Sequence, residues 1–71
     1  MTQELSFTLT KQFIPLIQLL KFLNVAESGA HASELVLTSN VLCNGNIELR
    51  KRYKVVKGDV IETQGFKIII N

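Results

Sequence analysis

The sequence lacks several residues and motifs that whole classes of protein require. It has no Trp, one Cys, one His and one Pro among 71 residues. A single Cys43 cannot form an intrachain disulfide, and with His31 it cannot supply the four ligands of a structural zinc site. No glycine-rich phosphate loop, catalytic carboxylate pair or base next to the Cys is apparent. The sequence therefore predicts no metal, no cofactor and no enzymatic activity.

Long hydrophobic runs are also absent. The most apolar stretch, residues 16–23, is interrupted by Gln18 and Lys21 and is shorter than the roughly 18 residues that a transmembrane helix needs. The first residues, Met1 to Glu4, have neither the basic nor the apolar segment of a signal peptide. We therefore expect a cytoplasmic monomer without a membrane partner, with residues 1–71 forming one domain around a modest core.

Positive charge is concentrated in one short segment. The whole chain carries a net charge of +2, yet residues 48–57 hold five cations against one anion. Anions outnumber cations by one in residues 1–47 and again in residues 58–71. Nearly all of the positive potential therefore comes from the basic segment, residues 48–57, whose cations are Arg50, Lys51, Arg52, Lys54 and Lys57.

The first third of the chain predicts a strand followed by a helix. Apolar and polar residues alternate from Leu5 to Leu9, which predicts a strand over residues 4–9 with one buried face. Four leucines then recur at the spacing of one helical face, with Pro15 placed in the first turn of that helix. We expect this helix to end at Asn24, because Asn tolerates the left-handed conformation that often follows a helix.

The rest of the chain predicts a second helix and several strands. Ser28 is a favourable N-cap for a helix over residues 29–38. The dipeptide Asn44-Gly45 between apolar alternations predicts a β-hairpin, and strand candidates follow at residues 60–61 and 66–70. The four Phe residues are scattered, and we expect them in the core or between helices. These elements indicate an α+β domain.

Five short motifs occur in a specific order over residues 16–61. They are Leu16-x-x-Leu19-Leu20-Lys21, Glu27-Ser28-Gly29-Ala30-x-Ala32, Val41-x-Cys43-Asn44-Gly45, Glu48-x-Arg50-Lys51-Arg52-x-Lys54 and Val55-x-x-Gly58-Asp59-x-Ile61. Their order and spacing resemble the S4 family of RNA-binding domains, the alpha-L motif, and within it the small stand-alone bacterial proteins of the YbcJ type. The resemblance implies two short helices packed on a small, mostly antiparallel sheet. It also implies binding of structured RNA, ribosomal or transfer RNA, in association with ribosomal particles and without catalysis.

The basic segment has two interpretations. If residues 49–55 are extended, Arg50, Arg52 and Lys54 share one face, while Tyr53 points to the opposite, apolar side. Such a row would suit phosphate contacts, which release counterions from nucleic acid. The same residues would also suit a solvent-exposed edge of the sheet, where their charges prevent pairing with strands of other molecules. The pattern leaves both open, and the resemblance favours RNA binding.

The expected RNA-binding surface combines the basic segment with the second helix. The cations of the basic segment are expected to anchor phosphates of the RNA. The free N–H groups at the start of the second helix favour a further phosphate. An exposed His31 without a task is an equally good interpretation of that residue. The resemblance adds the hairpin turn. The expected site residues are Lys21, Ser28, Gly29, His31, Asn44, Arg50, Lys51, Arg52, Lys54 and Lys57, with Lys21 and Lys57 at the margins.

Two rival functions use the same residues. In the first, the chain is a protein-interaction adaptor whose basic face docks on an acidic partner. In the second, it is an accessory domain that recruits RNA for an enzyme on another chain. Measurements of RNA affinity and of stable protein partners would separate them.

Overall fold

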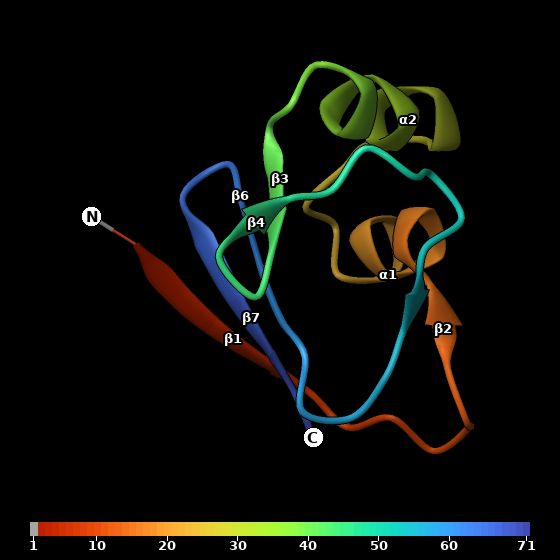
Figure 1. Cartoon of the computed structure of the whole chain (residues 1–71), viewed down its shortest axis with the longest axis vertical. Helices are drawn as coiled ribbons and strands as arrows, with labels where there is room; N and C mark the ends of the chain where they lie inside the picture. The colour runs from red at the N-terminus through yellow and green to blue at the C-terminus, as the bar shows by residue number, and fades with distance from the viewer. Residues whose placement is uncertain (1) are drawn as a thin grey trace.

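The computed structural model describes residues 2–71, in which two helices lie against one side of a curved sheet (Figure 1). None of the helices in these residues is both long and apolar enough to span a bilayer. In chain order the elements are β1 (Gln3–Phe7), β2 (Ile14–Pro15), α1 (Leu16–Phe22), α2 (Gly29–Leu37), β3 (Val41–Cys43), β4 (Asn46–Ile47), β5 (Lys54–Val55), β6 (Val60–Thr63) and β7 (Phe66–Ile70).

The main sheet has five strands in the order β1-β7-β6-β3-β4. Only β1 and β7 pair in parallel, and the other neighbours are antiparallel. A separate two-stranded ladder joins β2 to β5, so that Pro15 lies opposite Lys54. The expected α+β architecture, with two helices and a mostly antiparallel sheet, is confirmed.

The core lies between the helices and the inner face of the main sheet. Three of the four leucines predicted to share one helical face, Leu16, Leu19 and Leu20, have no exposed surface, while Leu23 follows the last residue of α1 and is only partly buried. Ala32, Leu35 and Val36 of α2 pack in the same cluster. The sheet contributes inward-facing residues from its central strands, Val41, Ile61, Ile68 and Ile70. Burial of these side chains is what stabilises so small a fold.

Helix ends and turns mostly follow their predicted chemistry. Asn24 has φ +59° after α1, as expected, and Asn44 and Gly45 take positive φ values in the β3–β4 hairpin. Ser39, at φ +63°, takes the left-handed position after α2. The β1 strand ends at Phe7 instead of residue 9, although Leu9 remains buried and its N–H donates to the backbone oxygen of Asn71.

Pro15 lies just before α1 and not in its first turn. Its ψ of 138° is extended, and it is the N-cap residue of the helix. The N–H of Leu16 then donates to the backbone oxygen of Tyr53 at 2.9 Å. The start of α1 is thus attached to the middle of the basic segment, which the sequence pattern did not predict.

Candidate nucleic-acid interface

The basic segment bends where an extended strand was expected. The N–H of Tyr53 donates to the backbone oxygen of Arg50 at 3.2 Å, which closes a turn at Lys51 and Arg52. Only Lys54 and Val55 are in a strand. The expected single row of Arg50, Arg52 and Lys54 along residues 49–55 is therefore wrong.

A local interaction explains the bend. The Glu48 carboxylate accepts three hydrogen bonds from Arg50, one from its backbone N–H at 3.0 Å and two from its guanidinium at 3.0 and 3.1 Å. Side-chain bonds of this kind to nearby backbone groups compete with strand pairing. They also hold the pKa of Glu48 below its usual value, chiefly through the guanidinium bond. Arg50 is therefore engaged with Glu48 and, at 5.1 Å, with the ring of Tyr53.

The turn brings cations from two distant parts of the chain around one open groove. We call this the basic groove. Lys51, Arg52 and Lys54 of the basic segment line it together with Lys21 of α1. It is lined by Phe13, Pro15, Ile17, Gln18, Lys21, Lys51, Arg52 and Lys54, with no acidic residue among them. Four positive charges thus converge on a partly apolar floor.

The start of α2 borders this groove. A Cβ atom added to Gly29 would lie 3.9 Å from Cδ of Lys21, so the two residues are neighbours. The Ser28 hydroxyl accepts from the N–H of His31 at 3.1 Å, and Nδ1 of His31 accepts from the N–H of Glu27 at 3.0 Å. The cap therefore occupies the Ser28 oxygen and one ring nitrogen. The first N–H groups of the helix, which have no partner within the helix, are next to Lys21.

Three of the expected site residues lie apart from the basic groove. Asn44 links the hairpin to β6, since its amide donates to Asp59 at 3.1 Å and accepts from the N–H of Val60 at 2.9 Å. Lys57 is exposed in the turn between β5 and β6. Arg50 lines an adjoining hollow with Arg52, Tyr53 and Lys54.

Asp59 is a structural residue that the sequence pattern did not reveal. It is only 7% exposed, and its carboxylate accepts from the Tyr53 hydroxyl at 3.0 Å and the Val56 N–H at 3.0 Å, besides the Asn44 amide. Through Tyr53, this buried carboxylate holds the basic segment in place.

Phe13 is the second residue whose position was not expected. We expected all four Phe side chains in the core or between helices, but Phe13 is 38% exposed and Phe22 68%. Phe13 lies among the cations of the basic groove, and Nζ of Lys54 is 5.1 Å from the centre of its ring. Many sites that bind single-stranded nucleic acid combine an exposed aromatic ring, on which a base stacks, with nearby Lys and Arg side chains.

Tyr53 can be titrated without interference, because it is the only Tyr and the chain has no Trp. Its pKa is raised by the neighbouring Cys43 thiol, by burial and by Asp59. A raised pKa means that the folded state retains the phenol proton longer, so stability falls as the pH rises above the unfolded value of about 10. We expect absorbance at 295 nm to rise well above pH 10, together with loss of the circular dichroism of the fold. A midpoint near 10 in the folded protein would contradict the partly buried hydrogen bond between Tyr53 and Asp59.

Comparison with known proteins bears on the same region. A family model described as the S4 domain matches residues 7–71, which include every residue that lines the basic groove. None of the curated proteins compared with the chain matches it.

Proposed function

The chain belongs to the S4 domain family, a family of RNA-binding modules, and we propose that it binds structured RNA through the basic groove and the adjoining start of α2. The proposed targets are folded ribosomal or transfer RNA, bound by a cytoplasmic monomer that acts without catalysis. Such RNAs fold tightly enough to place several phosphates within reach of one small surface.

The observation that carries this proposal is the convergence of four cations on one groove. Lys21 comes from α1, while Lys51, Arg52 and Lys54 come from the basic segment, and no carboxylate lies among them. A solvated edge that only prevents strand pairing would not need a cation from a distant helix. Closely spaced cations do suit a polyanion, because each neutralised phosphate releases counterions.

The start of α2 extends this surface. Its unpaired N–H groups and the positive end of the helix dipole favour a phosphate next to Lys21. Nε2 of His31 is not part of the cap, so it is available to donate to the same phosphate or to a 2′-hydroxyl. Contacts with phosphates and 2′-hydroxyls fit A-form RNA, whose deep major groove admits few side chains.

The test is a fluorescence-anisotropy titration of the unaltered protein against folded transfer RNA, a ribosomal RNA hairpin and duplex DNA at several salt concentrations. We expect tighter binding to RNA. The plot of log K against log salt should have a slope of about −2 to −4, as three or four phosphate contacts predict. Negligible RNA binding, with capture of an acidic protein by the same face, would instead support the adaptor.

Glu48→Gln should strengthen RNA binding several-fold. The change removes the carboxylate that holds Arg50, whose side chain is 73% exposed and lies beside Arg52 and Lys54. One more cation could then reach a phosphate, which would steepen the salt slope by about one contact. Glu4→Gln on β1 is the control, since it changes the net charge equally. An equal gain in both variants would show that only net charge matters.

A further inference from the structure

We propose that the basic groove receives an unpaired nucleotide of the RNA, with its base stacked on Phe13 and its phosphates held by the surrounding cations. This inference rests on the proposed function and deepens it. It specifies the RNA feature that the surface selects, a bulged or flipped base at the end or side of a helix, in preference to a continuous duplex.

The floor of the groove suits the flat face of an unpaired base. Phe13, Pro15 and Ile17 give it an apolar surface, and Phe13 keeps more than a third of its surface exposed. An uninterrupted RNA duplex presents sugars and phosphates and hides the faces of its bases. A duplex could place its phosphates against the cations, but it has no base face to pack on the apolar floor. An unpaired base has a flat π face that stacks on an aromatic ring.

The cations of the basic groove suit the phosphates of a nucleotide. Lys21, Lys51, Arg52 and Lys54 line the same groove as Phe13, and no acidic residue is among its lining residues. An apolar protein segment would have to bury its side chains among these charges without neutralising them, which is unfavourable. A nucleotide joins an aromatic base to a phosphate, and so it matches both the floor and its surroundings.

Lys54 covers the Phe13 ring in the free protein and can leave it when RNA binds. Its ammonium group lies over the Phe13 ring, 5.1 Å from the ring centre, and the residue is exposed. Because the Lys side chain is long and flexible, it can move from the ring to a flanking phosphate as the base takes its place. Gln18 lies in the same groove, and its amide can donate to and accept from a base edge.

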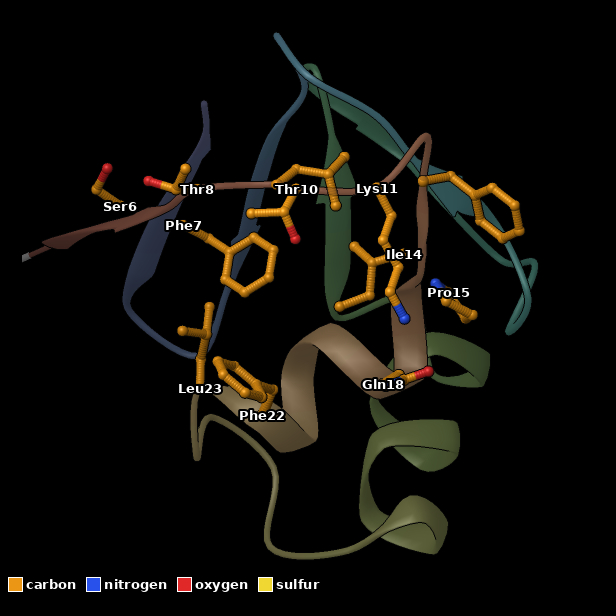
Figure 2. Close-up of a pocket in the computed structure, with 12 residues that line it drawn as sticks. Ser6, Phe7, Thr8, Thr10, Lys11, Ile14, Pro15, Gln18, Phe22 and Leu23 are labelled. Carbon is orange, nitrogen blue, oxygen red and sulfur yellow. The ribbon is translucent and has the colours of Figure 1, made fainter.

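Phe22 offers a matched control on the same side of the molecule. It is more exposed than Phe13, but its ring meets that of Phe7 edge-on, with centres 5.5 Å apart (Figure 2). It lines a neighbouring hollow in which Lys11 is the single cation. That hollow adjoins the basic groove at Phe13 and Gln18. Loss of Phe22 therefore removes an exposed aromatic ring without removing the platform among the cations.

The experiment compares two RNA hairpins that differ only in one bulged nucleotide, 2-aminopurine, which reports stacking by its fluorescence. The unaltered protein should bind the bulged hairpin roughly tenfold more tightly than the fully paired one, and should change the fluorescence. Phe13→Leu keeps an apolar side chain but removes the ring, so that preference should disappear. Phe22→Ala should retain it. Circular dichroism verifies that each variant is folded.

The outcomes separate this proposal from the one on which it rests. Salt-dependent binding of both hairpins with equal affinity, unchanged by Phe13→Leu, would overturn the nucleotide platform and leave RNA binding by the cations intact. A preference that Phe22→Ala abolishes and Phe13→Leu preserves would also overturn it. Failure to bind either hairpin would contradict both proposals.

Discussion

Replacing Asp59 by Ala should lower the free energy of unfolding by about 3 kcal/mol, a large part of the stability of so small a domain. The buried carboxylate accepts hydrogen bonds from the Tyr53 hydroxyl, the Val56 N–H and the Asn44 amide. Without it, these donors lose their partner in a partly buried site. For a domain of this size, the melting temperature should fall by roughly 10–20 °C.

Urea denaturation followed by circular dichroism measures this effect, with two variants as controls. Tyr53→Phe removes one of the three bonds and should lower the free energy of unfolding by about 1 kcal/mol. Glu62→Ala, on β6, removes a carboxylate for which the structure, across residues 2–71, records no hydrogen bond or ion pair. It should have a much smaller effect. A loss below about 1 kcal/mol for Asp59→Ala would show that the network does not hold the hairpin and basic segment together.

The double change of Lys51 and Arg52 to Ala should lower RNA affinity on the order of a hundredfold, because each charge-assisted phosphate contact is worth roughly tenfold. Both residues form the turn that projects into the basic groove. Their loss should also make the salt slope shallower by about two contacts. Stability should change little, since both side chains are exposed.

The matched control for this change is Lys57→Ala combined with Lys67→Ala. It removes the same charge from positions that do not line the basic groove. Anisotropy titrations at two salt concentrations should give an affinity within a few-fold of the unaltered protein. Equal losses in the two double variants would mean that RNA responds to overall charge and not to the groove.

The features that the sequence predicted depend on local determinants. The leucine spacing of α1, the Ser28 cap of α2 and the Asn44-Gly45 turn each act within a few residues, and each is present in the structure. The density of cations in residues 48–57 likewise indicated Lys51, Arg52 and Lys54, which line the basic groove, although it did not indicate Lys21. For these features, residue type and spacing contain enough information.

The features that were missed depend on contacts between distant segments. Pairing of β2 with β5 places Pro15 opposite Lys54, and no periodicity indicates a ladder of two residues. The position of Phe13 beside Lys54 and the bond between Asp59 and Asn44 likewise join segments far apart in the sequence. The bend of the basic segment had a local cause, the Glu48–Arg50 pair, but strand alternation took no account of side chains bonding to the backbone.

The most direct test of the account is to map the amide chemical shifts of the unaltered protein, labelled with ¹⁵N, during titration with a folded RNA hairpin. We expect the largest changes around the basic groove and the start of α2, at Phe13, Lys21, Gly29, Lys51 and Arg52. Amides of the outer sheet face, such as those of Glu62 and Lys67, should change little. Changes centred on the outer face, or no changes at saturating RNA, would contradict it.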